Sequence, residues 1–253
     1  MSDSLIQFMN KVPAAFCLIL QTTDKLYICR DRYGIRPLCI AETPDSFIVS
    51  SETVALPDSV TTCKQVLPGE IICCHDTMTT LCLYTNPSPI HSQLCLFEMI
   101  YLAHEQSTID GLSVTEFRQT LSTRLAHLDT QIQTLLDTYP RESICVVGIP
   151  STGILYGKMY AECLQLSYQQ LIIRRSHLKT RSFITHTPEQ RKQIADHKFY
   201  YEDQKIRGKH LILIDDSIVR GNIMESILTN CNRCGAASIH LRIPSPPVVD
   251  ICQ

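Results

Sequence analysis

The first third of the chain alternates short apolar runs with polar turns, a pattern that is typical of strands. Residues 13–20 and 25–30 are mostly apolar and the polar residues 21–24 separate them, so this stretch predicts a β-hairpin. Three more short strands are expected in this third, at residues 36–40, 46–50 and 71–74.

The pattern changes after Pro87-Ser88-Pro89, which has the composition of a linker. Apolar residues then recur at helical spacing from Val114 to Leu136, which predicts one amphipathic helix. Continuous apolar runs follow, and such runs suit strands that are buried on both faces of a parallel sheet. These runs are residues 144–149, 171–173 and 211–214, with helical stretches at 154–166 and 224–233 and a last strand at 238–243. The alternation of strands and helices predicts an α/β fold built from βαβ units.

Composition narrows the function classes. Hydrophobic residues make up 44% of the 253 residues and charged residues 19%, as expected for a globular core. The net charge of −2 gives no overall field that would attract nucleic acid or an anionic membrane, so any anion site must be local. No apolar stretch is long enough to span a bilayer, and the start of the chain lacks the pattern of a signal peptide. We therefore expect a cytoplasmic protein whose 13 cysteines are reduced thiols.

Residues 209–222 carry the most informative chemistry. Four apolar residues end in Asp215 and Asp216, and a short loop containing Gly221 leads into a helix. In open α/β sheets ligands bind beyond the carboxyl ends of the strands, and the N–H groups of such a loop face an anion. Two carboxylates beside an anion site fit a ligand that also carries neighbouring hydroxyl groups, because each carboxylate accepts several hydrogen bonds. The alternative for such a pair is an aspartate that caps the following helix.

This segment resembles the ribose-phosphate signature of phosphoribosyltransferases. Its form Asp-Asp-Ser-Ile-Val-Arg-Gly-Asn is similar to the version found in amidophosphoribosyltransferases. The resemblance continues in the family's own order at residues 31–38, 50–52, 66–71, 95–103 and 235–247. It implies that residues 1–92 are a β-rich remnant of an N-terminal-nucleophile (αββα) glutaminase domain. Residues 93–253 would then be a phosphoribosyltransferase domain, a mainly parallel sheet with helices on both faces.

The resemblance implies an enzyme of de novo purine (IMP) biosynthesis, a pentosyltransferase. Such an enzyme transfers glutamine-derived ammonia to phosphoribosyl diphosphate and forms 5-phosphoribosylamine. Carried over residue by residue, Asp215 and Asp216 would hold the ribose hydroxyls and Mg²⁺. The loop that would bind the 5′-phosphate consists of Ser217, Ile218, Val219, Arg220, Gly221 and Asn222.

A second anion loop is expected at Ser151, Thr152 and Gly153, which lie between a strand and a helix. The family usually has an acid at the position of Ser151, and a helix N-cap is an equally good interpretation of these hydroxyls. The segment 175–184 resembles the loop that closes over the substrate, with Arg175 where the family usually has lysine. A solvated basic face is the alternative for this segment.

The chain departs from the family at positions that bear on activity. The family's glutaminase uses a cysteine at the mature N-terminus as its nucleophile, whereas this chain begins Met1-Ser2-Asp3, so we expect no glutamine hydrolysis. The usual threonine after Asn222 is Ile223, which removes a hydroxyl donor and weakens phosphate binding by roughly 1.5–3 kcal/mol. Some members hold a [4Fe–4S] cluster on four cysteines. Cys95 and Cys252 match two of these positions, and we expect them to be unoccupied remnants.

Three interpretations of the function stay open. In the first, the chain is a partial enzyme, truncated at both ends relative to the family, that binds phosphoribosyl diphosphate or a nucleotide. In the second, it is a non-catalytic module, such as a hetero-oligomer partner of an intact homologue. The third is an incomplete gene model. A homo- or hetero-oligomer is expected for the first two.

Overall fold

The computed structural model describes residues 2–75, 80–84, 92–175, 198–219 and 221–250 of the chain. It divides into two compact units, residues 1–117 (unit 1) and 118–253 (unit 2), and each is described by itself. The expected linker Pro87-Ser88-Pro89 lies outside the described residues. The boundary expected after residue 92, between a glutaminase-like domain and a phosphoribosyltransferase domain, stays a prediction.

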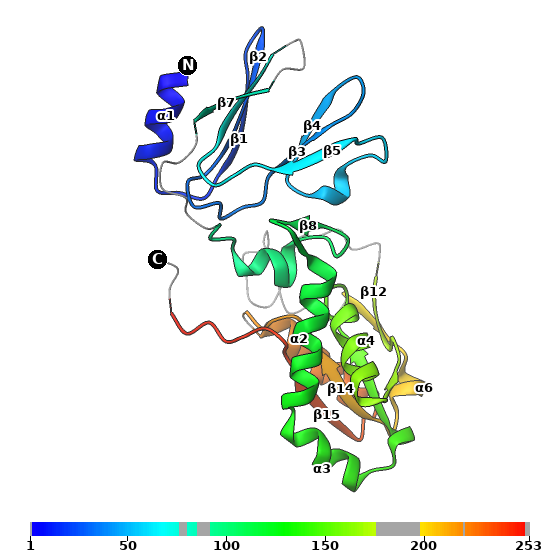
Figure 1. Cartoon of the computed structure of the whole chain (residues 1–253). Coiled ribbons are helices and arrows are strands. Elements are labelled where there is room, and N and C mark those ends of the chain that lie inside the picture. The colour runs from blue at the N-terminus through cyan, green and yellow to red at the C-terminus, as the bar shows by residue number, and fades with distance from the viewer. Residues whose placement is uncertain (1, 76–79, 85–91, 176–197, 220, 251–253) are drawn as a thin grey trace. The chain divides into compact units, whose positions relative to one another are not determined.

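Unit 1 combines one N-terminal helix with antiparallel sheets, coloured from blue to green in Figure 1. Its elements are α1 (Ser2–Lys11), β1 (Cys17–Gln21), β2 (Lys25–Arg30), β3 (Cys39–Glu42), β4 (Phe47–Ser50), the 3-10 turn Thr53–Ala55, β5 (Thr62–Gln65), β6 (Ile71–His75), β7 (Thr80–Tyr84), the π-helix Glu98–Leu102, β8 (Thr108–Ile109) and β9 (Leu112–Ser113). The two larger sheets have the strand orders β1-β2-β6-β7 and β4-β3-β5. The predicted hairpin is confirmed as β1 and β2, which pair antiparallel. Sequence analysis missed α1, β5, β7, β8 and β9.

The two central strands of the four-stranded sheet in unit 1, β2 and β6, are packed on both faces. Successive side chains of a strand point to opposite sides, so each strand contributes to two cores. The residues on the α1 side are Tyr27, Cys29, Ile71 and Cys73, which pack with Leu5 and Met9 of the helix. The residues on the other side are Ile28, Ile72 and Cys74, which pack with Leu38, Ile40 and Val66. Unit 1 is therefore layered as helix, sheet and second sheet, which explains why β2 and β6 read as nearly continuous apolar runs.

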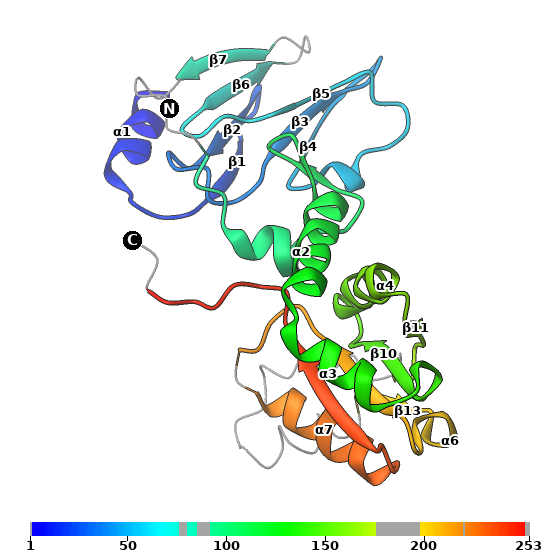
Figure 2. The same cartoon turned by 60° about the horizontal axis from the view of Figure 1, so that its bottom comes forward.

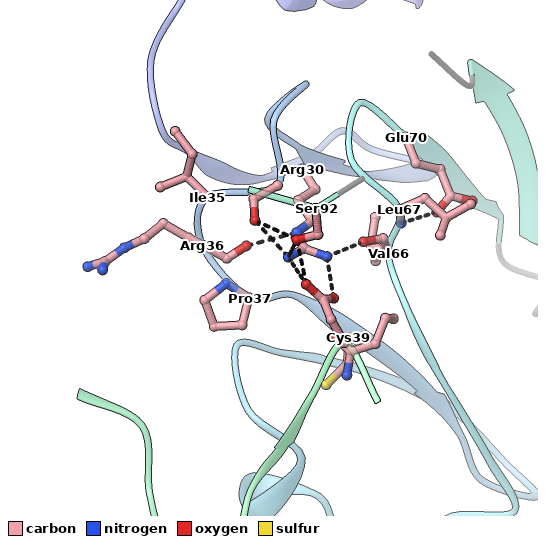
Figure 3. Close-up of polar contacts among 12 residues, drawn as sticks. Arg30, Ile35, Arg36, Pro37, Cys39, Val66, Leu67, Glu70 and Ser92 are labelled. Atoms are coloured by element: carbon pink, nitrogen blue, oxygen red, sulfur yellow. Dashed lines mark hydrogen bonds and ion pairs between the residues drawn. The ribbon is translucent and has the colours of Figure 1, made fainter. Parts of the chain in front are cut away.

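Arg30, at the end of β2, is a fully buried arginine whose guanidinium is hydrogen-bonded on every side (Figure 3). Its Nε donates to the carbonyl of Arg36 at 2.8 Å, and its two Nη atoms donate to the carbonyls of Val66 and Gly34. The Nη atoms also form a bidentate ion pair with Asp110, at 2.8 and 2.9 Å. A buried charge persists only when it is paired and hydrogen-bonded. Arg30 therefore fixes the loop that follows β2.

Asp31, which is also fully buried, organises the same loop. Its carboxylate accepts the N–H of Tyr33 at 2.9 Å, and its carbonyl accepts the N–H groups of Gly34 and Gly69. Gly34 has φ +65°, and a Cβ at this position would lie 2.7 Å from Cγ of Pro68. The turn therefore requires glycine at this position.

Unit 2 is a parallel sheet with helices on both faces. Its elements are α2 (Val114–Leu128, which starts within unit 1), α3 (Thr130–Thr138), the 3-10 turn Arg141–Ser143, β10 (Ile144–Gly148), α4 (Gly153–Leu164), β11 (Ser167–Tyr168), β12 (Ile172–Arg174), β13 (Phe199–Tyr201), α6 (Asp203–Ile206), β14 (His210–Ile214), α7 (Asn222–Arg233) and β15 (Ser238–Arg242). The sheet has the order β11-β10-β14-β15, and every neighbouring pair is parallel. Strands β10 and β14 are buried at every residue, as their continuous apolar runs predict.

The two faces of this sheet pack against different helices, α7 on one side and α3 and α4 on the other (Figure 2). The α7 side contains Cys145, Val147, Leu211 and Leu213 with Met224, Ile227 and Cys231. The opposite side contains Ile144, Val146, Ile212 and Ile214 with Tyr156, Tyr160, Ile132 and Leu135. The predicted fold class is confirmed: a mainly parallel α/β sheet in unit 2 and antiparallel β structure in unit 1.

Two predictions about unit 2 are wrong in detail. The helix predicted from Val114 to Leu136 is two helices, because Asp129 interrupts it and caps α3 by accepting the N–H groups of Gln131 and Ile132. The apolar run 171–173 is not part of the parallel sheet, since β12 pairs antiparallel with β13. A three-residue run is too short to distinguish these two strand environments.

The cysteines contribute mainly to the cores. Burial raises the thiol pKa of Cys29 and Cys145 to about 11 and that of Cys231 to about 12. The eleven cysteines whose side chains the structure describes are free thiols. These three behave as small apolar side chains.

Replacing Arg30 by methionine is expected to lower the free energy of unfolding by about 3–5 kcal/mol, because Asp110 would be left as a half-buried carboxylate without its partner. Chemical denaturation followed by circular dichroism would measure this change. Arg32→Met is the matched control, because the described side-chain contacts of Arg32 are with its neighbour Tyr33, and a change of about 1 kcal/mol or less is expected. Equal effects of the two variants would contradict the role given to Arg30.

Candidate functional site

The paired acids lie at the carboxyl edge of the parallel sheet. Asp215 and Asp216 directly follow β14, which pairs in register with all five residues of β10. One further bond, from the N–H of Ile149 to the carbonyl of Ile214 at 2.8 Å, continues this ladder beyond β10. The loop that leaves β10 therefore begins next to the acids, as the sequence predicts for two anion loops at one edge.

Glycines allow these two loops to touch through their backbones. A Cβ on Gly153 would lie 2.4 Å from the carbonyl oxygen of Ile214 and 3.3 Å from Cα of Asp215. A Cβ on Gly148 would lie 2.5 Å from the carbonyl oxygen of Gly153. Distances below 3.0 Å do not occur for real Cβ atoms, so the start of α4 packs directly on the end of β14. Gly153 was singled out for anion binding, and the structure gives it a packing role in addition.

Asp216 connects the two loops. It is 4% exposed, and its carboxylate accepts hydrogen bonds from the hydroxyls of Thr152 and Ser217. Thr152 stands at the N-cap position of α4, but its side chain caps no N–H group of the described helix. The N-cap interpretation of Thr152 is therefore wrong, because its hydroxyl is bonded to Asp216 instead. Ser151 is exposed.

The predicted phosphate loop leads from Ser217 into α7. Ile218 and Val219 are 49% and 79% exposed, and Arg220 lies outside the described residues. Gly221 has φ +73° and occupies the N-cap position of α7, where its carbonyl accepts the N–H of Glu225. Glycine at the N-cap leaves the first N–H groups of α7, from Asn222 onward, to other acceptors. Neither aspartate caps this helix, so the capping alternative for the pair is wrong.

Lys198 is a cation within electrostatic reach of Asp215 that sequence reasoning missed, and the backbone of Arg175 is bonded to it. Arg175, the expected contact from the closing loop, is exposed, and its N–H donates to the carbonyl of Lys198 at 3.0 Å. The side chain of Lys198 is half-buried, which lowers its pKa together with the charge of Arg174, while Asp215 raises it. The sequence gives no signal for Lys198, because only the pairing of β12 with β13 in the fold brings it near the acids. The remainder of the expected closing loop lies outside the described residues.

Asp215 carries charge that its surroundings do not neutralise. Burial, followed by the neighbouring Asp216 carboxylate, raises the pKa of Asp215 to about 7, although the Asp216 N–H and Lys198 act in the opposite direction. A carboxyl group with a strongly raised pKa at a strand edge is a candidate for a functional site. A cation bound between the two acids would relieve this unfavourable charge.

The donor set at this edge fits Mg²⁺. Carboxylate oxygens are the hard ligands that Mg²⁺ prefers, and proteins often supply only one or two of them while substrate phosphates and water supply the rest. Within the described residues no cluster of three or more His, Cys, Asp or Glu side chains is placed to hold a metal by itself. The [4Fe–4S] positions give no further test, because Cys95 is a half-buried free thiol and Cys252 lies outside the described residues.

Two buried polar side chains behind Asp216 were also missed. Arg118 of α2 is 3% exposed and Tyr156 of α4 is fully buried. Burial raises the pKa of the Tyr156 phenol, Arg118 lowers it through its charge and a hydrogen bond, and the charge of Asp216 raises it. In the sequence both residues lie inside segments that read only as helices, so only the tertiary structure brings them to the site.

Comparison with known proteins relates the chain to amidophosphoribosyltransferases. A family described as "Glutamine amidotransferase domain" matches residues 4–58. The amidophosphoribosyltransferase of Mycobacterium tuberculosis is 32% identical over 98% of this chain, and that of Bacillus subtilis is 28% identical over 100% of it. The solved glutamine phosphoribosylpyrophosphate amidotransferase of B. subtilis, in complex with ADP and GMP, superimposes with a TM-score of 0.81 at 28% identity over 99% of this chain. The chain spans 45% of the M. tuberculosis protein, 50% of the B. subtilis protein and 52% of the solved chain.

A parallel sheet with two acids at one strand tip, joined to a second loop at the neighbouring tip, defines unit 2 as a phosphoribosyltransferase-type domain. The whole chain is homologous to amidophosphoribosyltransferases, and the resemblance read from the sequence is confirmed. No helix among the described residues is long and apolar enough to cross a membrane.

The free energy of unfolding is expected to fall as the pH rises through the titration of Asp215. Its pKa is about 7 in the folded chain and 3.8 in an unperturbed one, so ionisation between these values opposes folding. Asp215→Asn should remove this fall and raise the free energy of unfolding at pH 8 by about 1–3 kcal/mol. Urea denaturation at pH values from 4 to about 8 measures it. Asp137→Asn, at an exposed aspartate of α3, is the control and should leave the pH profile unchanged. A wild-type profile that is flat over this range would contradict the raised pKa.

Proposed function

We propose that unit 2 binds phosphoribosyl diphosphate together with Mg²⁺ at the carboxyl edge of its parallel sheet. One observation carries the proposal: the acids at the tip of β14 are hydrogen-bonded, through Thr152 and Asp216, to the loop at the tip of β10. This arrangement places two carboxylates between two loops that can each present N–H groups to an anion. A ligand with vicinal hydroxyls flanked by two phosphate groups matches that order of donors and acceptors.

Each part of the site then has a role. Asp215 and Asp216 accept the ribose hydroxyls, and the loop from Ser217 to Asn222, including Ile218, Val219, Arg220 and Gly221, binds the 5′-phosphate. Ser151, Thr152 and Gly153 bind the diphosphate, assisted by Arg175 and by Lys198. Mg²⁺ bound by the acids would neutralise charge on the leaving diphosphate. The two acids and the cations around them orient the sugar for attack at its anomeric carbon.

The reaction that this binding would serve is the transfer of glutamine-derived ammonia to phosphoribosyl diphosphate, the reaction that the resemblance to amidophosphoribosyltransferases implies. A nucleotide is the second candidate ligand, and the B. subtilis structure, which is complexed with ADP and GMP, supports it. A nucleoside monophosphate shares the ribose hydroxyls and the 5′-phosphate, so it would compete for the same acids and the same loop. Assembly with further copies or with a homologous chain, and a cytoplasmic location, remain predictions.

Isothermal titration calorimetry with phosphoribosyl diphosphate and Mg²⁺ tests the proposal. We expect binding that needs Mg²⁺, that GMP weakens by competition, and that Asp216→Asn reduces at least about tenfold. Asp203→Asn, at an exposed acid in α6, is the control and should bind as the wild type does. Absence of binding at millimolar ligand by a folded wild-type chain would refute the proposal.

Ile223 allows a gain-of-binding experiment. It occupies the first turn of α7, and its side chain packs partly on the core that contains Met224 and Ile227. Ile223→Thr supplies a hydroxyl beside the proposed phosphate site, and we expect about tenfold tighter binding of phosphoribosyl diphosphate. Ile223→Val is the matched control, because it also reduces packing but adds no donor, and its affinity should not increase. Calorimetry measures the affinity of both variants for phosphoribosyl diphosphate. Equal affinities would contradict a phosphate contact at this position.

A further inference from the structure

A buried arginine and a buried tyrosine lie behind the acid pair, and the proposed ligand contacts do not account for them. Arg118 is 3% exposed, although arginine is almost never buried unless it is paired. Its guanidinium hydrogen-bonds to the hydroxyl of Tyr156, a fully buried residue of α4. The same hydroxyl lies within electrostatic reach of the Asp216 carboxylate. The three groups therefore form a series from α2, through α4, to the tip of β14.

The helix α4 connects this series to the site mechanically as well. Tyr156 follows Thr152 by four residues, so the two side chains lie on the same face of the helix, one turn apart. Thr152 donates its hydroxyl hydrogen bond to Asp216, and Ser122 of α2 donates to the carbonyl of Tyr156 at 2.8 Å. Helix α2 thus holds α4 at Tyr156 through a side-chain and a backbone contact. One turn before Tyr156, α4 holds Asp216 through the hydroxyl of Thr152.

The series from Arg118 to Asp216 brings positive charge toward a buried carboxylate. Asp216 is 4% exposed, and the hydroxyls that bond to its carboxylate, those of Thr152 and Ser217, are neutral donors. These hydroxyls satisfy the carboxylate oxygens but bring no positive charge to balance them. The guanidinium of Arg118 is hydrogen-bonded to the phenol that lies within electrostatic reach of this carboxylate, so Arg118 adds positive charge to the series.

We propose that Arg118 and Tyr156 are positioning residues that hold the Asp216 carboxylate in the orientation in which it receives the sugar hydroxyls and Mg²⁺. The role given to Asp216 rests on the proposed function. The link from Arg118 through Tyr156 to Asp216 is a property of the ligand-free chain and can be tested without any ligand. Removing the phenol hydroxyl should therefore alter the Asp216 carboxylate while the fold persists.

The helix offers a matched control for this experiment. Tyr160 lies one turn beyond Tyr156, is equally buried, and donates its hydroxyl to Asp129 rather than toward Asp216. Tyr156→Phe and Tyr160→Phe remove the same atom from the same helix at the same burial. A merely structural role predicts similar consequences for the two variants. A positioning role predicts that only Tyr156→Phe affects the acid pair.

The first measurement uses protein labelled with ¹³C at the aspartate carboxyl carbons, with the Asp216 signal assigned through Asp216→Asn. Tyr156→Phe should shift the Asp216 carboxyl resonance at fixed pH, and Tyr160→Phe should shift that of Asp129 instead. Arg118→Lys keeps the charge and should move the Asp216 signal less than Arg118→Met does. An Asp216 resonance that is unmoved in Tyr156→Phe and in Arg118→Met would overturn the proposal. If Tyr156→Phe does not fold, the two Arg118 variants decide it by the same readout.

The second measurement is calorimetry with phosphoribosyl diphosphate over a range of Mg²⁺ concentrations. Tyr156→Phe should bind about tenfold more weakly and need more Mg²⁺ for half-maximal binding, while Tyr160→Phe should bind as the wild type does. Wild-type binding that Tyr156→Phe leaves unchanged would overturn the positioning role. A wild-type chain that binds no phosphoribosyl diphosphate, but whose Asp216 resonance responds to Tyr156→Phe, would refute the proposed function and support the positioning pair.

Discussion

A contact between two backbones, with no side chain between them, determines the geometry of the site. Gly153 at the start of α4 lies against the carbonyl of Ile214 at the end of β14, closer than any residue with a Cβ could approach. Because this contact follows directly on the in-register pairing of β10 and β14, the loops at the two strand tips have almost no freedom to separate. The hydrogen bond from Thr152 to Asp216 is a consequence of this closeness. Every role proposed for the acids depends on it.

The surroundings of Arg30 and of Asp215 treat buried charge in opposite ways. In unit 1 the guanidinium of Arg30 is fully matched by Asp110 and by carbonyl oxygens, and the result is a fixed loop. In unit 2 the carboxyl of Asp215 is held beside a second acid, and its pKa is raised to about 7. A matched charge belongs to the framework, whereas an unmatched one is maintained by the rest of the fold and marks a place where a ligand can improve the energy. This contrast favours the sheet edge of unit 2, rather than the Arg30 loop, as the place where a charged ligand binds.

The sequence predicts those features that depend on local pattern. The buried strands β10 and β14 are continuous apolar runs, and the acids follow one of them directly, so their place at the sheet edge could be derived. The break at Asp129 was missed because the apolar period continues across it, and only the capping bonds reveal that α3 is a new helix. Lys198, Arg118 and Tyr156 could not be found, because each reaches the acids through tertiary packing. Their neighbours in the sequence say nothing about which residue of another element they will meet.

The cysteines of the two cores have a practical consequence. Cys29 is enclosed in unit 1, Cys145 and Cys231 are enclosed in unit 2, and burial suppresses thiolate formation at all three. Since only a thiolate reacts readily with alkylating reagents, each of these sulfurs is protected from alkylation until its surroundings unfold locally. Alkylation of these cysteines therefore reports local unfolding in each unit. The order in which these sulfurs acquire an alkyl group would reveal which half of the chain loosens first.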